Sequence, residues 1–471
     1  MIKHYMIPLL LCAILLPPGC RDKEPPLVEI TNPEDGSLVG DSVSVVIEVR
    51  DNSDVYYADL YIDDVYVDRL YGEAGTYMWL TDSLQHFSEH RLRAEAVDMA
   101  LNDTISDAVS VTVIHPGTVR WQLQLNGYVQ GCPAVGADGT VYVTVVENYP
   151  GYCYLVAINP DGSQKWQCQL GGGEGSGPVI GPDGTIYALA WISSGMYTTI
   201  NFSAIHPTGA PVWEIGNVSG CPAIGADGAL YLGGSEGLHV YNPDGSLRCV
   251  YELPYRVYNP AIAADGTIYF GCGDSYTGDF YVYALNPDIT LKWRYGVHLS
   301  TEIAIGFDNT IYFCAYDYYM YALDAEGSLQ WRYYTGYSPQ LPPVIGYGGL
   351  IYTSGRISGY PRYIALDPNG ALVWTGFPDV YPREGIAVVA DSTVYFAADK
   401  LYAMTPDHQL KWTYDFDDDG ERQITIGTDG MIYVAGNHTL YAINGLAPLA
   451  KMQSPWPKIR HDEKNTGRGG F

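Results

Sequence analysis

A short phrase recurs eight times along this 471-residue chain, and its repetition limits the available folds more than any other feature. The phrase combines an Asp-Gly turn with Thr, an apolar residue and Tyr. Its Tyr stands at positions 142, 187, 231, 269, 312, 352, 395 and 433, at intervals of 38 to 45 residues. Seven phrases have Asp four residues before the Tyr, and the sixth has Gly348 there. An Asp-Gly turn between apolar runs predicts a β-hairpin, because both residues tolerate positive φ.

Each repeat, numbered here as modules 1 to 8, carries a second phrase, such as Val156-Ala-Ile-Asn159 or Ile364-Ala-Leu-Asp367. In six modules a Trp follows the end of that phrase by seven positions; these residues are Trp166, Trp213, Trp293, Trp331, Trp374 and Trp412. Module 3 has Cys249 at this place, and module 8 has no such residue because the array ends there. A further Trp, Trp121, precedes module 1 and belongs to no module.

Each module has room for four short strands, and a single four-stranded sheet cannot bury its own faces. Eight sheets arranged radially bury these faces against each other and leave only short edges. The strand around Trp121 is then expected to complete the sheet of module 8 and close the ring. We therefore predict an all-β chain in which residues 118–445 form an eight-bladed β-propeller and the seven Trp residues dock adjacent blades.

The run from Ala365 to Trp374 resembles the tryptophan-docking repeat of pyrroloquinoline-quinone-like propellers, the superfamily of quinoprotein alcohol dehydrogenases. The resemblance covers residues 118–445. It implies that an enzyme of this kind has an adjacent Cys-Cys pair over the quinone, a calcium site of Glu and Asn, an Asp base and long insertions. This chain has no Cys-Cys pair, and its modules are near minimal length. We therefore expect neither the quinone as a cofactor nor dehydrogenase activity.

Residues 27–115 show a different pattern, in which apolar and polar residues alternate over short runs between Asp, Asn, Gly and Ser turns. The expected strands are Val43–Val49, Ala58–Ile62, Leu92–Val97 and Val109–Val113. This pattern predicts a β-sandwich. The segments Ile30–Gly36 and Glu89–Asp98 resemble those of bacterial immunoglobulin-like domains. No Cys pair bridges the two sheets, so packing alone must hold the core.

The start of the chain is expected to direct export. Lys3 precedes an apolar run, Met6–Leu16, which is too short to span a bilayer and is typical of a secretory signal. We therefore assign residues 1–19 to a signal peptide and residues 20–26 to a tether.

The Gly19-Cys20 pair resembles the bacterial lipobox, although Pro17 departs from that pattern. The resemblance implies lipidation of Cys20 and, from Arg21, sorting to the outer membrane. Secretion without a lipid anchor is the alternative.

Charge and cysteine content limit the partners and the covalent links. The formal net charge is −28, and so acidic a surface repels phosphates, which argues against a nucleic-acid partner. Apart from Cys12 and Cys20, seven cysteines remain, an odd number without a Cys-x-x-Cys motif. Several occupy positions that are apolar in neighbouring modules, which favours buried free thiols, while any pairing stays open.

The sequence contains no His-Glu-x-x-His, Walker or Gly-x-Ser-x-Gly motif. One segment suggests a metal, because Asp415, Asp417 and Asp419 place three carboxylates on one side of a tight loop, as calcium prefers. The Glu that calcium loops have at their twelfth position is Ile426 here. A solvated acidic connector between modules 7 and 8 is the alternative, and we expect no other cofactor.

Residues 446–471 form a tail that contains Trp456-Pro457, Asp462 and Thr466-Gly467, similar to segments that flank such arrays. We expect the tail to pack across the propeller or its rim, with a frayed terminus as the alternative.

Two classes of function remain. The first, which we favour, is a non-enzymatic lipoprotein of the cell envelope that presents its propeller to a protein or glycan partner. The second is a ligand-binding or catalytic propeller that uses its central funnel for a quinone, sugar or metal.

Overall fold

The computed structural model describes residues 24–471 apart from positions 53, 86, 149–150, 195–196, 275–276, 337–340, 358, 377–384, 419–421, 446–457, 459, 463–464 and 469–471. The chain divides into two compact units, Met1–His115 and Pro116–Phe471. Within the described residues the regular structure consists of β-strands and one short 3-10 turn, η1 (Tyr347–Gly349), which confirms the all-β class. No helix in this part of the chain is long and apolar enough to cross a membrane.

The described residues of the first unit form two β-sheets. The smaller sheet contains, in spatial order, β1 (Leu27–Asn32), β3 (Ser42–Arg50) and β6 (Ala74–Leu80). The order in the larger sheet is β2 (Ser37–Val39), β9 (Val109–Val113), β7 (Glu89–Asp98), β4 (Val55–Ile62) and β5 (Val65–Leu70). A short strand, β8 (Asp103–Ile105), pairs with β7. All pairs run antiparallel except β2 with β9.

Alternation along these strands turns one face of each sheet towards a shared core. In β3, Val45, Ile47 and Val49 are buried, and they belong to one hydrophobic cluster with Leu60 of β4 and Leu92 of β7. Two sheets that pack face to face over such a core form a β-sandwich. The first unit is therefore held by apolar packing, and its sequence from residue 27 to residue 115 contains no cysteine.

The described residues of the second unit form eight four-stranded antiparallel sheets, which we number by module. Sheet 1 contains β11 (Tyr128–Val135), β12 (Val141–Glu147), β13 (Tyr152–Ile158) and β14 (Gln164–Gly172). Sheet 2 contains β15 (Val179–Ile180), β16 (Ile186–Ser194), β17 (Tyr197–Ile205) and β18 (Pro211–Gly216). Sheet 3 contains β19 (Val218–Ile224), β20 (Leu230–Gly234), β21 (Gly237–Tyr241) and β22 (Leu247–Glu252). Sheet 4 contains β23 (Arg256–Ile262), β24 (Ile268–Asp274), β25 (Asp279–Leu285) and β26 (Leu291–Gly296).

The second half of the array follows the same plan. Sheet 5 contains β27 (Ala304–Ile305), β28 (Ile311–Cys314), β29 (Tyr319–Leu323) and β30 (Leu329–Tyr334). Sheet 6 contains β31 (Val344–Ile345), β32 (Ile351–Ile357), β33 (Tyr360–Leu366) and β34 (Leu372–Gly376). Sheet 7 contains β35 (Ile386–Val388), β36 (Val394–Ala397), β37 (Lys400–Met404) and β38 (Leu410–Asp415). Sheet 8 contains β39 (Gln423–Ile426), β40 (Ile432–Ala435), β41 (Thr439–Ile443) and, as its outer strand, β10 (Val119–Gln124).

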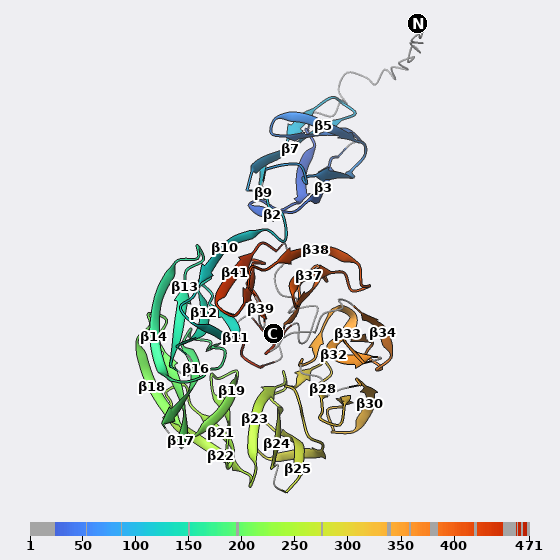
Figure 1. Cartoon of the computed structure of the whole chain (residues 1–471). Coiled ribbons are helices and arrows are strands. Elements are labelled where there is room, and N and C mark those ends of the chain that lie inside the picture. Colours follow the sequence, from blue (N-terminus) through green and yellow to red (C-terminus); the bar gives the residue numbers. More distant parts are fainter. Residues whose placement is uncertain are drawn as a thin grey trace. The chain divides into compact units, whose positions relative to one another are not determined.

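The sheets of the second unit follow one another around a common centre in sequence order, with the first strand of each sheet innermost (Figure 1). Each sheet shares a cluster of buried apolar residues with the next. One further cluster joins the last sheet to the first, through residues such as Tyr433 and Leu440 of sheet 8 and Val141 of sheet 1. The apolar contacts therefore run around the whole ring.

Within a sheet, the Tyr and Trp of each module lie two strands apart on the same face. In sheet 6, Ala365 pairs with Tyr352 on one side and with Trp374 on the other. The small Ala lets the two rings approach across it, and the Tyr352 and Trp374 centroids are 6.0 Å apart. The same pairing in the other sheets that carry a Trp gives centroid distances of 5.5 to 6.0 Å. This cross-strand ladder explains why Ala recurs in the second phrase of the module.

The Trp side chains also reach the next module. In sheet 5 the Trp331 indole Nε1 donates a hydrogen bond of 2.8 Å to the carbonyl oxygen of Pro368, in the turn between the third and fourth strands of sheet 6. Five other Trp residues make the same bond at 2.9 to 3.0 Å. The indole faces a Gly of that turn, and a Cβ on Gly370 would lie only 2.5 Å from Trp331. These turn glycines have positive φ, for example +80° at Gly370.

Two turns replace the Gly with another residue. In the turn of module 7, His408 has a φ of 70°, and its ring stacks on Trp374 with a centroid distance of 4.5 Å. In the turn of module 4, Ile289 has a φ of 69°, and the sheet before it carries Cys249 instead of an indole. This turn position thus accepts a side chain in two cases: when the indole of the preceding sheet can stack on that side chain, or when the preceding sheet has no indole there.

The closing contact of the ring uses the segment before module 1. Strand β10 pairs with β41, and Trp121 lies opposite Ala442 in the place that a fourth-strand Trp takes elsewhere. Gly117 stands in for the missing turn of module 8, because its amide donates to the Asn444 carbonyl oxygen at 2.9 Å and its Cα faces the Trp412 indole. The two ends of the array are therefore joined by the same contacts that join neighbouring modules.

Gly370 and Gly278 provide a matched test of the indole contact. Gly278 has a φ of 76° and open space around a built Cβ, whereas the space at Gly370 is filled by Trp331. We expect Gly278→Ala to lower the free energy of unfolding by about 1 kcal/mol, through the left-handed backbone alone. We expect Gly370→Ala to lower it by about 3 kcal/mol, because the indole must also move. Urea unfolding followed by Trp fluorescence checks the difference, and equal losses in the two variants would contradict it.

Candidate functional site

The described part of the tail lies against the first strands of several sheets, at the centre of the ring. Lys458 forms an antiparallel bridge with Ala387 of sheet 7. Farther along, the Thr466 and Gly467 carbonyl oxygens accept the backbone amides of Ile224 and Ile262, which lie in sheets 3 and 4. The tail therefore connects modules that lie far apart in the sequence.

Asn465 is buried, and its side chain makes four hydrogen bonds. Its Nδ2 donates to the carbonyl oxygens of Cys132, Pro133 and Pro178 at 3.2, 3.1 and 3.0 Å. Its Oδ1 accepts a hydrogen bond of 2.6 Å from Nζ of Lys458, which is also buried. One side chain thus ties the tail to sheets 1 and 2.

Arg460 performs the same task for sheets 3 and 4. Its Nη2 donates to the Pro222 carbonyl oxygen, and its Nη1 to that of Pro260 at 3.4 Å. The side chain is buried, and its guanidinium lies against Gly467, where a Cβ would collide with it. The prolines at positions 133, 178, 222 and 260 all stand nine residues before the Tyr of their modules. Tail donors therefore meet equivalent carbonyl oxygens in modules 1 to 4.

The Asp462 carboxylate shapes the turn between these two donors. It accepts the Thr466 amide at 2.8 Å and the Thr466 hydroxyl at 2.6 Å. Burial alone would raise the pKa of Asp462, but the neighbouring His461 and the bonds from Thr466 lower it well below its usual range. The carboxylate therefore stays charged at ordinary pH and keeps the turn closed.

A cavity of about 480 Å³ lies beside the tail at the centre of the ring. Arg460 and Asn465 form part of its wall. Seven other lining residues share one place in the repeat, ten residues before the module Tyr; they are Cys132, Gly177, Cys221, Asn259, Glu302, Pro342 and Gln423. We did not identify this position from the sequence. The sequence signal that marks this position is its variation: different modules carry Cys, Gly, Asn, Glu, Pro or Gln there.

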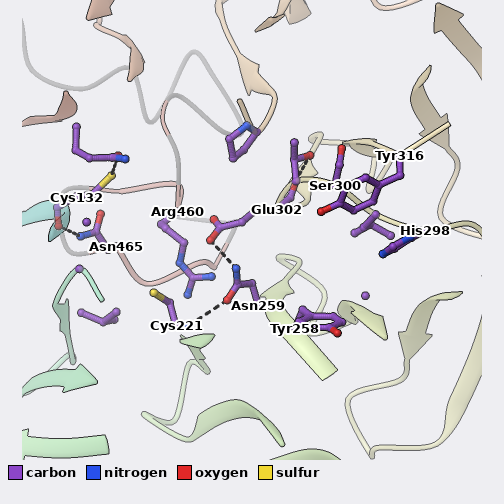
Figure 2. A pocket seen from close by; sticks show the side chains of 18 residues that line it. Cys132, Cys221, Tyr258, Asn259, His298, Ser300, Glu302, Tyr316, Arg460 and Asn465 are labelled. Atoms are coloured by element: carbon purple, nitrogen blue, oxygen red, sulfur yellow. Dashed lines mark hydrogen bonds between the residues drawn. The ribbon is translucent and has the colours of Figure 1, made fainter. Parts of the chain in front are cut away.

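Figure 2 shows Cys132 and Asn465 at one end of the cavity in that view, and His298 and Tyr316 at the other. Between them, the Asn259 Nδ2 donates to Glu302 Oε1 at 3.0 Å. The Asn259 Oδ1 accepts the backbone amide of Cys221 at 3.1 Å. Both polar ends of the Asn259 side chain are thus engaged within the wall.

The other end of the cavity is aromatic. The His298 ring stacks on Phe280 and has Tyr316 on another side, with ring centroids 4.2 Å from that Tyr. Tyr316 and Tyr258 are exposed, at 54% and 46% of their surface. Burial lowers the pKa of His298, so the ring is neutral at pH 7. The wall at this end therefore presents rings without a formal charge.

The acidic residues that suggested calcium do not form a described cluster. Asp415 Oδ1 lies 2.5 Å from Lys400 Nζ on the neighbouring strand, and Asp417 lines a small separate cavity. Asp419 and Cys20 lie outside the described residues. Among the described residues, no group of three or more His, Cys, Asp or Glu side chains is placed to hold a metal. The calcium site and the lipid anchor stay predictions.

The seven docking Trp residues (121, 166, 213, 293, 331, 374 and 412) take no part in the cavity wall. They lie at the contacts between sheets described above, and they serve the architecture that positions the cavity.

The seven cysteines within the described residues are free. Cys153, Cys272 and Cys314 are buried in the sheets, whereas Cys249 is half-buried. Burial raises the pKa of each of the three buried thiols to about 12. Because the thiolate is the reactive form, a raised pKa reduces the reactive fraction at any ordinary pH.

We therefore expect iodoacetamide at pH 8 to leave Cys153, Cys272 and Cys314 unmodified in the folded protein. Cys249 serves as the accessible comparison and should react first. Peptide mass spectrometry after native and denatured labelling checks this order, and rapid native labelling of the three buried thiols would contradict it.

Asn465 offers a test of the bonds between tail and ring. Asn465→Asp keeps the shape of the side chain but replaces the amide donor with an acceptor that faces three carbonyl oxygens. We expect a loss of about 3 kcal/mol in the free energy of unfolding at pH 7. Asn369→Asp, at an exposed turn, is the control and should change it little. Denaturant titration of both variants measures the difference, and a stability equal to that of the parent would refute the assigned bonds.

No family model matches the chain, and no curated protein matches it. Among solved structures, BamB from Moraxella catarrhalis is similar at 15% identity and a TM-score of 0.50, covering 69% of this chain and 97% of its own. The Dos1 propeller is similar at 9% identity and a TM-score of 0.54, covering 70% and 95%. A quinonprotein alcohol dehydrogenase-like protein from Bacteroides thetaiotaomicron aligns at 11% identity and a TM-score of 0.38, covering 74% and 95%. The first two likenesses confirm that the fold of the second unit is a β-propeller.

Proposed function

We propose that this chain is a non-enzymatic scaffold of the cell envelope, in which an eight-bladed propeller of the pyrroloquinoline-quinone-like kind presents one face to a protein partner. An immunoglobulin-like sandwich precedes the propeller, and a lipid on Cys20 anchors the chain to the outer membrane. The exposed tyrosines of the propeller carry the proposal.

In each four-stranded sheet, the loops from the second to the third strand and from the fourth strand to the next sheet lie at one edge. We call the face of the ring formed by these edges the loop face. Seven described tyrosines on it expose 45% to 65% of their surface; they are Tyr128, Tyr152, Tyr258, Tyr316, Tyr318, Tyr334 and Tyr360. The opposite face carries the Asp-Gly turns, with Phe307 and Tyr347 as its exposed aromatic residues. Tyr is enriched in protein interfaces because it combines a large apolar ring with a polar group.

The cavity at the centre opens among the same loops. His298, Ser300 and Glu302 lie between β26 and β27, and Tyr316 lies between β28 and β29. A partner that covers the loop face would therefore also cover the cavity.

The cavity residues do not match the set that the resemblance implies for a quinone enzyme. Glu302 and Asn259 are of the types expected for calcium, but the Asn259 oxygen accepts the backbone amide of Cys221. Cys132 and Cys221 belong to different modules, so the wall has no adjacent Cys pair. The Arg460 Nη atoms, which could bind the carboxylates of the quinone, already donate to carbonyl oxygens. We derive no reaction step through this cofactor.

A ligand-binding or catalytic propeller is the second candidate. The observation in its favour is that Glu302 and Asn259 meet in the central cavity, as a calcium-assisted quinone site requires. Purified protein incubated with the quinone and calcium separates the two candidates. Retained quinone absorbance together with alcohol- or sugar-dependent dye reduction would replace the scaffold proposal by this one.

The scaffold proposal is tested by photo-crosslinking in the envelope of the native host. A photoreactive phenylalanine at Tyr316 samples the loop face, and the same group at Phe307 samples the opposite face. We expect Tyr316 to give a discrete adduct with one protein and Phe307 to give none, because the aromatic surface lies on the loop face. Adducts from Phe307 alone, or from neither position, would contradict a partner on the loop face.

A further inference from the structure

Glu302 is a half-buried carboxylate in the wall of the central cavity. Among the described residues its side chain accepts a hydrogen bond from Asn259 and forms no ion pair. A carboxylate that is partly withdrawn from water gains from a cationic partner more than a fully exposed one does. Its position therefore favours an occupant of the cavity that brings positive charge.

The tail shows how this ring holds a guanidinium group. The Arg460 side chain spans two adjacent modules and donates to the carbonyl oxygens of Pro222 and Pro260. The described tail residues bond to sheets 1, 2, 3, 4 and 7. The cavity extends along modules 4 to 6, where Asn259, Glu302 and Pro342 line it. A second guanidinium would find there a full carboxylate in place of neutral carbonyl oxygens.

The aromatic end of the cavity suits a planar cation. Tyr258 and Tyr316 are exposed and line the same cavity as Glu302, and cations bind favourably over aromatic rings. Arginine stacks on rings and donates in a plane to a carboxylate, which a lysine ammonium cannot do in the same way. The volume of about 480 Å³ lies within the range of sites that enclose small groups.

Among the described residues that line the cavity, the charged groups are Glu302 and Arg460, and His298 adds an uncharged ring at pH 7. The charges of this described lining cancel, and Arg460 directs its Nη atoms to carbonyl oxygens of the wall. The chain as a whole has a net charge of −28, so its long-range field attracts cations. A positively charged group is thus favoured both at a distance and at Glu302.

We propose that an arginine side chain of the partner protein enters the central cavity, pairs with Glu302 and stacks on Tyr258 or Tyr316. This inference rests on the proposed function, because the partner that covers the loop face supplies the arginine. The site recognises the guanidinium group, so that a basic segment on the partner surface is the matching feature.

The chemistry is tested with two small probes, N-acetyl-arginine amide and its uncharged counterpart N-acetyl-citrulline amide. Calorimetric titration of the purified full chain should show binding of the arginine probe and about tenfold weaker binding of the citrulline probe. Glu302→Gln should weaken the arginine probe by about tenfold as well, since the Gln oxygen still accepts from Asn259 while the charge is lost. Glu147→Gln, at the end of β12 and outside the cavity wall, is the control and should bind like the parent.

Equal affinity for the two probes, or equal affinity of the parent and Glu302→Gln, would overturn the inference. An unchanged thermal unfolding midpoint in Glu302→Gln shows that the variant is folded; if it is not, Tyr316→Ala, at an exposed position, replaces it. The crosslinking experiment separates this inference from the scaffold proposal. If Glu302→Gln leaves the Tyr316 adduct unchanged, the arginine contact is wrong and the scaffold stands. If the arginine probe binds but no adduct forms, the cavity chemistry stands and the scaffold proposal is wrong.

Discussion

The contact between an indole and the turn of the next module holds the second unit together. Apolar packing between two sheets is not directional and would tolerate sliding. The hydrogen bond from Trp331 to Pro368, together with the flat contact on Gly370, fixes one sheet against the next at a single point. At the closure Trp412 meets Gly117 and Trp121 meets the turn of module 1, so the first segment of the unit carries both contacts. The position of every lining residue depends on this spacing.

The sequence predicted the propeller because the residues that join sheets must be alike in every module. Tyr352, Ala365 and Trp374 form one ladder across a sheet, and equivalent residues return at regular intervals. The cavity could not be predicted in the same way. Its lining position touches the centre of the ring instead of a neighbouring sheet, so nothing requires Asn259 and Glu302 to resemble each other. Their meeting depends on how two modules are placed in space.

Departures from the repeat are explained by what each position contacts. Gly is needed in a turn where an indole lies on it, yet His408 replaces it by stacking on the indole, and Ile289 follows a sheet with no indole. If the turns were judged by Gly alone, both would have been predicted to lack the contact between neighbouring sheets. For the acidic run, the spacing of Asp415, Asp417 and Asp419 suggested one site. The structure pairs Asp415 with Lys400 on the neighbouring strand, but Asp419 lies outside the described residues, so the calcium site stays a prediction.

The tail gives a nearly symmetric ring one distinct site. Equivalent carbonyl oxygens face the centre from modules 1 to 4, and Asn465 and Arg460 bond to them because the single tail segment reaches that side. The cavity extends beyond them along modules 5 and 6, where Glu302 supplies a charge that no other module has at that place. Symmetry thus provides stability through repeated contacts, and its interruption makes one part of the centre chemically distinct. A propeller of identical modules would present the same lining residue eight times, whereas here the tail segment and one carboxylate make one part of the cavity wall different from the rest.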